Sequence, residues 1–261
     1  MNAILLAAGY GTRLYPLTKH HPKALLPLGP QKVVLDVILE NLRSVASLRD
    51  VVLVSNHLFI DQFREWNATR HRHVKLVDDG TSTPETRLGA INDLVLGLSQ
   101  MDRADDVLVV GTDNVFTWLL QDLVSFAAKK RPAAVVAVRE VPTNEEASQL
   151  GVVELDANAR ILRFLEKPAD PPARTIALCV YVFPLAMQRR LTDFVTQEGN
   201  ADAPGFFIEW LVKTEPVYGY LTSGEWLDIG THTSYDQAVQ RWAAPGSSVQ
   251  EPARNKRSGH A

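Results

Sequence analysis

The sequence of 261 residues predicts an α/β fold in which helices cover both faces of a mixed, mostly parallel central sheet. Short apolar runs rich in β-branched residues recur through the first half, and they are continuous rather than alternating, as in strands that are buried on both faces. Segments with helical spacing lie between these runs, and such alternation is typical of a parallel sheet between two helical layers. The expected architecture is therefore a Rossmann-like three-layer sandwich.

The predicted elements can be placed in order along the chain. In the first half, strands are expected at 3–7, 51–55, 74–77, 107–110 and 134–138, and helices at 34–45, 59–69, 88–101 and 119–129. The second half changes character, with two strands joined by a turn within 151–168, a strand at 175–183, and helices at 185–197, 206–213 and 234–242. We expect one domain over residues 1–242 and a disordered tail over 243–261, which is rich in Pro, Gly, Ser and charge.

Composition excludes several classes of protein. The chain is 46% hydrophobic and 22% charged, the usual mixture of a globular protein. Its net charge of -3 argues against binding of nucleic acid through the overall field. The single cysteine, Cys179, excludes an internal disulfide framework, and the apolar run at the start is too short to span a membrane. We expect a cytoplasmic protein that binds neither nucleic acid nor membrane.

A long basic loop follows the first strand. No convincing strand or helix is predicted over 9–32, and connections of that length without a function are uncommon. Gly9 and Gly11 let the backbone approach a ligand closely and direct N–H groups towards it. No acidic residue precedes Asp36, whereas the loop carries Arg13, Lys19, Lys23 and Lys32. The loop therefore predicts a polyphosphate site.

Two familiar phosphate loops do not fit this segment. A Walker loop needs Gly-Lys-Ser/Thr, but Gly11 is followed by Thr12 and Arg13. A dinucleotide fingerprint needs a third glycine that opens a helix, and the chain has Leu14 and Tyr15 instead. A nicotinamide-dependent oxidoreductase is therefore disfavoured.

The stretch "LAAGYGTRLYPLTKHHPKALLPLG" closely resembles the signature of the sugar-1-phosphate nucleotidyltransferases, the pyrophosphorylases that make nucleotide sugars. Among them are thymidylyl- and uridylyltransferases of glucose 1-phosphate and guanylyltransferases of mannose or heptose 1-phosphate. The resemblance implies catalytic roles for Arg13, at the α-phosphate and leaving pyrophosphate, and for Lys23 beside them. It implies a nucleotide-binding role for Leu6, Ala8, Gly9, Gly11 and Thr12.

The same resemblance implies a Mg²⁺ site made by two distant carboxylates. Asp113 follows a predicted strand in "VGTDNVF", at the edge where open α/β sheets bind ligands. Taken alone, Asp-Asn is more typical of a turn. Asp228 lies in "EWLDIGT", a form that the family shares. The alternative role for Asp228 is an N-cap of the following helix, which Thr231 or Thr233 could serve equally well.

Further segments resemble the sugar and base sites of the family. "FLEKP" implies that Glu166 binds sugar hydroxyls and Lys167 the sugar phosphate, and Gly151 is retained beside them. Leu150 replaces a common tyrosine, and Cys179 lies near an expected glycine. For the base, Gly89 is the position of close approach, with Thr86 or Arg87 as alternatives at its edge.

The expected reaction joins a nucleoside triphosphate to a sugar 1-phosphate and releases pyrophosphate, with Mg²⁺. Two alternatives stay open at this stage, a phosphocholine cytidylyltransferase-like enzyme and a catalytically silent regulatory subunit that binds nucleotide sugars. The sequence leaves the base, the sugar, the pathway and assembly into a homo-oligomer undetermined.

Overall fold

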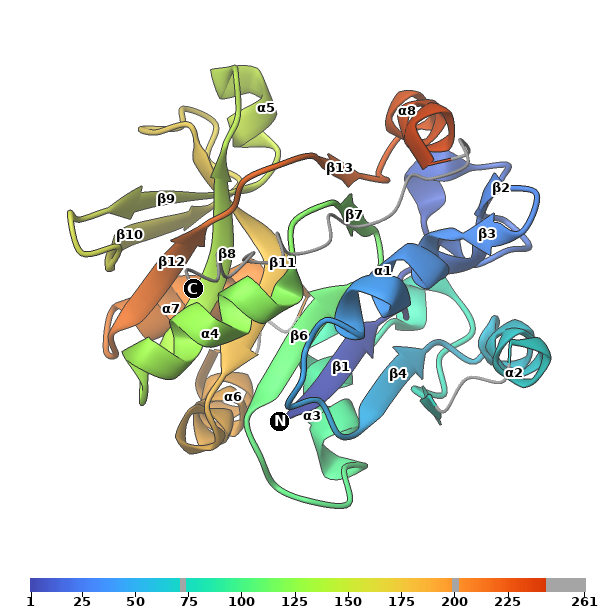
Figure 1. Ribbon diagram of the computed structural model, residues 1–261, viewed down its shortest axis with the longest axis horizontal. Coiled ribbons are helices and arrows are strands. Elements are labelled where there is room, and N and C mark those ends of the chain that lie inside the picture. The colour runs from blue at the N-terminus through green and yellow to red at the C-terminus, as the bar shows by residue number, and fades with distance from the viewer. Residues whose placement is uncertain (71–73, 199–201, 243–261) are drawn as a thin grey trace, which may run out of the picture.

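The computed structural model describes residues 1–70, 74–198 and 202–242, and within them a main sheet is flanked by helices (Figure 1). Nine strands of this part form the sheet, in the order β12-β8-β11-β6-β1-β4-β5, with the β9-β10 hairpin also joined to β11. They are β1 Asn2–Leu6, β4 Val51–Ser55, β5 Lys75–Asp78, β6 Val107–Gly111, β8 Ala134–Glu140, β9 Gly151–Leu155, β10 Ile161–Glu166, β11 Thr175–Phe183 and β12 Val217–Leu221. The predicted tail at 243–261 lies outside the described residues.

The sheet is mixed, as predicted. Strands β5, β4, β1 and β6 run parallel to one another, and β12 is parallel to β8. Strand β11 is antiparallel to both of its main neighbours, β6 and β8. The carboxyl ends of β1 and β6 therefore meet at one edge, from which the loops that follow them extend.

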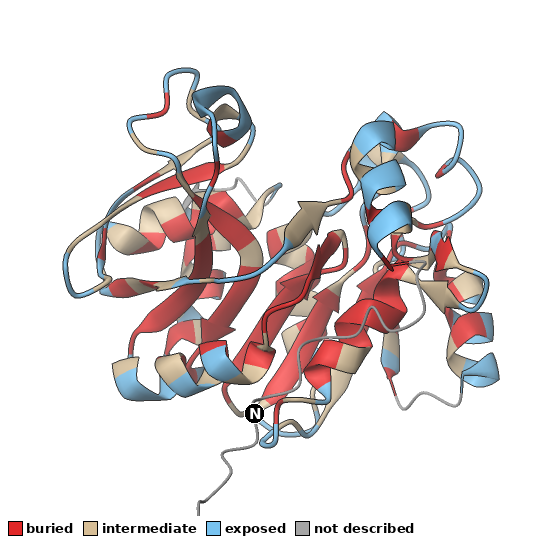
Figure 2. Cartoon of the chain, turned by 45° about the horizontal axis from the view of Figure 1, so that its top comes forward, coloured by how far each residue is buried: buried red, intermediate tan, exposed pale blue. Residues whose placement is uncertain are grey.

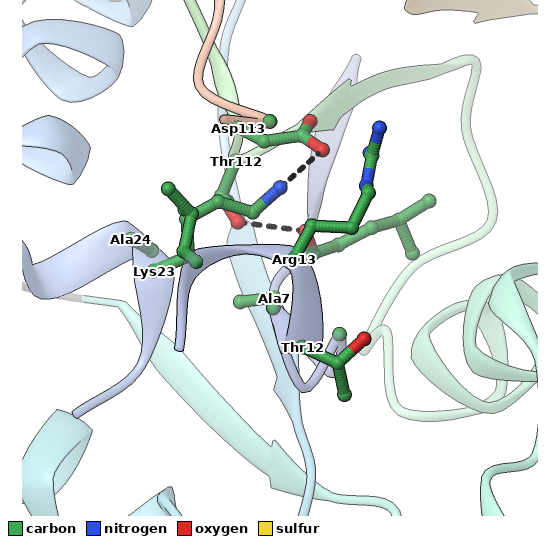
Figure 3. A pocket seen from close by; sticks show the side chains of 12 residues that line it. Ala7, Thr12, Arg13, Lys23, Ala24, Thr112 and Asp113 are labelled. Carbon is green, nitrogen blue, oxygen red and sulfur yellow. Dashed lines mark hydrogen bonds and ion pairs between the residues drawn. The ribbon is translucent and has the colours of Figure 1, made fainter. Parts of the chain in front are cut away.

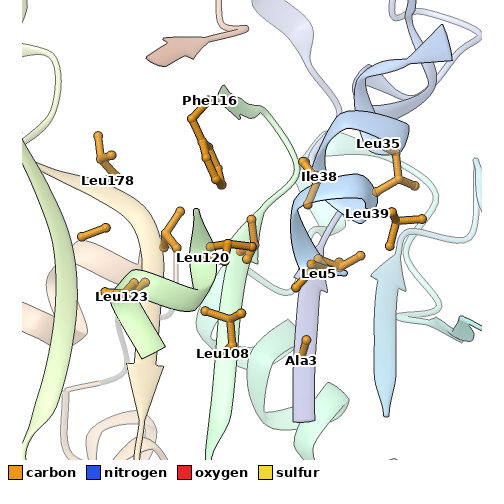
Figure 4. Packing of buried hydrophobic residues seen from close by; sticks show 14 of the residues in the cluster. Ala3, Leu5, Leu35, Ile38, Leu39, Leu108, Phe116, Leu120, Leu123 and Leu178 are labelled. Atoms are coloured by element: carbon orange, nitrogen blue, oxygen red, sulfur yellow. The ribbon is translucent and has the colours of Figure 1, made fainter. Parts of the chain in front are cut away.

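Helices cover both faces of the sheet, which confirms the three-layer α/β class. Neighbouring strand residues point to opposite sides, so Leu5 belongs to one core cluster and Ile4 to the other. Figure 4 shows the first cluster, in which Leu5 and Leu108 of the sheet lie below Leu39 and Leu123. The first layer contains α1 Val34–Leu42, α2 Ile60–Thr69 and α4 Leu120–Lys130, and the second α3 Ala90–Ser99, α6 Leu185–Glu198 and α7 Pro204–Val212. Strands β1, β4, β6, β8 and β11 between them are buried over most of their length (Figure 2).

Two small ribbons lie beyond the main sheet. Strand β2 Pro27–Gly29 pairs with β3 Lys32–Val33, and β7 Asn114–Phe116 pairs with β13 Trp226–Asp228. Helix α8 His232–Trp242 follows β13 and packs beside β2, where it shares a third apolar cluster with the N-terminal half. These contacts bring the last described segment against the first loop.

Several elements differ from the sequence expectation. The loop at 9–32, expected to lack regular structure, contains 3₁₀ turns at Thr12–Leu14 and Lys23–Leu25 as well as β2. Strands β7, β12 and β13 and the short helix α5 Asn144–Ser148 were also not predicted. Such short elements depend on distant partners rather than on a periodic pattern. Among the described residues, no helix has the length and apolar character needed to cross a bilayer.

Candidate active site

The loop after β1 is held in shape by its own side chains. Gly11 has a left-handed φ of 62°, and a Cβ there would lie 3.2 Å from the Thr18 side chain. The Thr18 hydroxyl donates to the Gly11 carbonyl at 2.7 Å, and Asn56 donates to the Ala8 carbonyl at 2.9 Å. The glycine is therefore required both by backbone conformation and by close packing. The turn that results places Arg13 at the carboxyl edge of the sheet.

Basic and acidic side chains meet directly beyond this turn. The Lys23 ammonium donates to Asp113 Oδ2 at 2.9 Å, as Figure 3 shows with Arg13 nearby. A Cβ on Gly230 would lie 2.6 Å from Asp228 Oδ2 and 3.2 Å from Arg13 Nη2, so that residue must be very small. The structure therefore brings together the four charged residues that three separate motifs predicted.

The β7-β13 ribbon is what brings the two carboxylates together. Asp228 pairs with Asn114 in the ribbon, and the Ile229 amide donates to the Asp113 carbonyl at 2.8 Å. Asp228 is therefore fixed by strand pairing rather than serving simply as a helix cap.

The two carboxyl groups have opposite pKa shifts. Burial alone would raise the pKa of Asp113, but the attraction and hydrogen bond from Lys23, helped by Arg13, lower it overall. Burial raises the pKa of Asp228 to about 6, and the neighbouring charge of Asp113 adds to this rise. Burial and the charge of Asp113 therefore disfavour a second negative charge on Asp228, whereas Lys23 and Arg13 favour the charge on Asp113.

The donor set fits Mg²⁺. Within residues 1–70, 74–198 and 202–242 there is no group of three or more His, Cys, Asp or Glu side chains able to hold a metal. The carboxylates of Asp113 and Asp228 are hard oxygen donors, and Mg²⁺ in proteins is commonly bound by one or two carboxylates plus substrate phosphates.

Two cavities meet at this cluster. The first, of about 190 Å³, is lined by the loop that follows β1, including Gly9, Thr12 and Lys23. The second, of about 460 Å³, extends over β9, β10 and β11. Arg13 and Asp113 line both. Of the predicted site residues, the first cavity also contains Leu6 and Gly11, and the second Gly151, Glu166, Lys167 and Asp228.

The wall of the second cavity holds a carboxylate in a narrow space. A Cβ on Gly205 would lie 1.8 Å from Glu166 Oε2, so the first turn of α7 can approach only because this residue is glycine. Burial raises the pKa of Glu166, Lys167 lowers it, and Glu209 raises it further. Lys167 itself has a φ of 47°, a strained conformation for a non-glycine residue, and such strain concentrates at functional sites.

The predicted base site is less well defined. Gly89 precedes α3 with a φ of 89°, and neither Gly89 nor Ala8 is among the residues that line the two cavities. The Arg87 guanidinium forms an exposed ion pair with Asp202 at 2.8 Å. Arg87 therefore pairs with the segment before α7, and its contact with a base edge stays a prediction.

Three residues that sequence reasoning did not select also belong to this region. Asn114 is buried next to Asp113, Trp226 lines the second cavity, and Gly205 packs on Glu166. The sequence contained one signal, the Asn of the Asp-Asn motif. The contacts of Trp226 and Gly205 depend on segments far apart in the chain.

A sheet edge with a glycine turn, two bases and two carboxylates is typical of proteins that handle phosphate groups. Residues 2–244 match the family model described as nucleotidyl transferase, and the chain belongs to that family.

Curated relatives agree with this family. A glucose-1-phosphate adenylyltransferase 1 from Vibrio parahaemolyticus is 28% identical over 264 residues, covering 90% of this chain and 64% of the relative. A glucose-1-phosphate adenylyltransferase from Thermotoga sp. strain RQ2 is 28% identical over 254 residues, covering 90% of this chain and 59% of the relative. The chain thus spans less than two thirds of these proteins.

Solved structures show the same fold. A Bacillus anthracis protein assigned as a glucose-1-phosphate thymidylyltransferase, in complex with sucrose, has a TM-score of 0.80 at 20% identity, with 93% of this chain and 95% of that chain covered. A UDP-glucose pyrophosphorylase complexed with UDP-glucose has a TM-score of 0.76 at 20% identity, with 92% and 97% covered.

Proposed function

We propose that this chain transfers a nucleotidyl group from a nucleoside triphosphate to a sugar 1-phosphate. An oxygen of the sugar phosphate attacks the α-phosphorus in line, a new P–O bond forms, and the bond from the α-phosphorus to the bridging oxygen breaks. Pyrophosphate leaves with that electron pair. The observation that carries the proposal is the junction of the two cavities, where Arg13 and Asp113 face both.

The side chains have separate tasks in this reaction. The loop backbone from Gly9 to Thr12 would hold the triphosphate, and Arg13 would stabilise charge that develops on the α-phosphate and leaving group. Lys23 balances Asp113 through its 2.9 Å contact and is within reach of the first cavity. Two polyanions must meet, so positioning and charge neutralisation supply most of the catalysis.

The remaining predicted residues complete the proposal. Asp113 and Asp228 would hold Mg²⁺, which when bound supplies positive charge at the phosphates. Gly151, Glu166 and Lys167 would contact the sugar 1-phosphate from the wall of the second cavity. Gly89 is proposed to lie against the base.

Two substitutions test the catalytic assignment through pyrophosphate release. Arg13→Ala and Asp113→Ala should each reduce turnover by about a hundredfold, or about 2.7 kcal/mol, as expected for one lost transition-state contact. Arg64→Ala and Asp61→Ala are matched controls, because those side chains are 60% and 88% exposed. Near-normal turnover in either folded site variant would defeat the assignment.

A substrate matrix identifies the reaction. Five nucleoside triphosphates are combined with common sugar 1-phosphates and with choline phosphate, in the presence of Mg²⁺. Glucose 1-phosphate comes first, because the names of the relatives contain it. Release with a sugar 1-phosphate supports the proposal, and release with choline phosphate alone indicates the cytidylyltransferase-like alternative. No release with any pair indicates the silent, nucleotide-sugar-binding alternative.

A further inference from the structure

A short chain of hydrogen bonds runs from an indole ring to the candidate metal carboxylate. The Trp226 Nε1–H donates to Asn114 Oδ1 at 2.7 Å. The Asn114 amide Nδ2 then donates to Asp113 Oδ1 at 2.8 Å, while Asp113 Oδ2 accepts from Lys23 at 2.9 Å. Each oxygen of the Asp113 carboxylate therefore has its own protein donor.

The indole determines which way the asparagine amide faces. An indole N–H is a donor only, so it can satisfy Asn114 only when the amide oxygen points to it. That orientation directs the amide NH₂ group to Asp113, where it donates. The reversed amide would place oxygen against the carboxylate and would leave the partly buried indole N–H without its acceptor, which costs free energy. Asn114 is 3% exposed, so water offers little compensation.

The ribbon makes this connection rigid. Trp226 and Asp228 lie on the same short strand, β13, whose register pairs Asp228 with Asn114 and Leu227 with Val115. The Arg139 guanidinium stacks over the Trp226 ring, 5.6 Å from its centroid. The indole is therefore fixed on the strand that also carries the second carboxylate.

We infer that Trp226 is a positioning residue, which acts through Asn114 to orient the Asp113 carboxylate for a divalent cation. The inference rests on the proposed function in one respect, because it takes Asp113 as a metal ligand. Partners behind a metal ligand typically affect metal affinity by 10- to 100-fold. Because Trp226 acts through one intermediate residue, we expect a loss of about tenfold when its donor is removed.

The test measures binding of Mn²⁺ alone by electron paramagnetic resonance, without substrates. Trp226→Phe keeps an aromatic ring but removes the donor, and Asn114→Ala removes the intermediate. Trp210→Phe is the matched control, since that ring stacks on Phe207 in α7, outside both cavities. We expect weaker Mn²⁺ binding in the first two variants and wild-type binding in the control.

A double-mutant cycle separates relay from general damage. If Trp226 acts through Asn114, the Trp226→Phe/Asn114→Ala protein binds Mn²⁺ no more weakly than Asn114→Ala alone. Additive losses, or wild-type affinity in Trp226→Phe, would overturn the relay. Circular dichroism checks that each variant folds. If Trp226→Phe does not fold, a wild-type Mn²⁺ affinity in Asn114→Ala overturns the relay instead.

Failure of the relay is distinguishable from failure of the proposed function. Pyrophosphate release by the wild type, combined with unchanged Mn²⁺ affinity in Trp226→Phe, refutes only the relay. Equal Mn²⁺ affinity in wild type and Asp113→Ala refutes the metal assignment, and the relay with it. In active enzyme, Trp226→Phe should raise the Mg²⁺ concentration needed for half-maximal rate more than the KM of the sugar 1-phosphate.

Discussion

A buried pair of aspartates should make the stability of this protein depend on pH. Asp93 in α3 is 6% exposed, and burial, followed by the charge of Asp79, raises its pKa to about 7. Asp79 Oδ2 and Asp93 Oδ1 are both buried, and neither oxygen accepts a hydrogen bond from any donor among the described residues. The other Asp79 oxygen accepts from the Thr81 amide at 2.7 Å. A proton that Asp93 holds and shares with Asp79 satisfies both carboxyl groups.

The sign and size of the effect follow from linkage. An aspartate in the unfolded chain has a pKa of about 3.9, so between about pH 4 and pH 7 the folded protein binds this proton more tightly. The stabilising contribution of the proton is therefore complete below about pH 4 and is lost as the pH rises through 7. Three pKa units correspond to about 4 kcal/mol, of which about 3 kcal/mol is lost between pH 5 and pH 8.

Asp93→Asn removes the titration and keeps a hydrogen-bond donor. The free energy of unfolding is measured in urea at pH 5 and at pH 8. Between these two conditions wild type should lose about 3 kcal/mol of unfolding free energy that the Asp93→Asn variant does not lose. The neighbouring pair of His57 and Asp78 titrates alike in both proteins and cancels from the difference. Asp61→Asn, at an 88% exposed side chain, is the control. Parallel pH dependence in the Asp93→Asn variant and wild type would refute the shared proton.

Three further substitutions probe the site. Gly205→Ala places a Cβ 1.8 Å from Glu166 Oε2, so that carboxylate must move, and the KM of the sugar 1-phosphate should rise about tenfold with less change in kcat. Gly11→Ala forces alanine to a φ of 62°, and urea unfolding should show a loss of about 1–2 kcal/mol. Lys23→Met removes the attraction that lowers the pKa of Asp113, so the acidic limb of the kcat/KM profile should move to higher pH; an unmoved limb would contradict this.

The main sheet and its helices were predictable because their signals are local. Continuous apolar runs such as β6 and the amphipathic spacing of α1 reveal burial directly. Strands β7 and β13 contain three residues each and exist because their partners are far away in the sequence. Strand β12 was also not predicted. Its Gly219 packs closely against a distant residue, since a Cβ there would lie 2.9 Å from the Leu155 side chain.

In the candidate site, too, the residues in local motifs were predictable and the contacts between distant segments were not. Arg13, Lys23, Asp113 and Asp228 each lie in a compact motif, and the structure places them together. The link from Trp226 to Asp113 could not be predicted, because it depends on the register of one ribbon. Similarly, no local pattern indicates that an aspartate in an amphipathic helix will share a proton.

The β7-β13 ribbon has a consequence for how the protein is made. Asp113 leaves the ribosome long before Asp228, and domains can begin to fold during synthesis. Arg13, Lys23 and Asp113 have then already been translated, while the second carboxylate has not. A chain that ends before β13 therefore carries Arg13, Lys23 and Asp113 but lacks Asp228, so it cannot complete the pair of carboxylates.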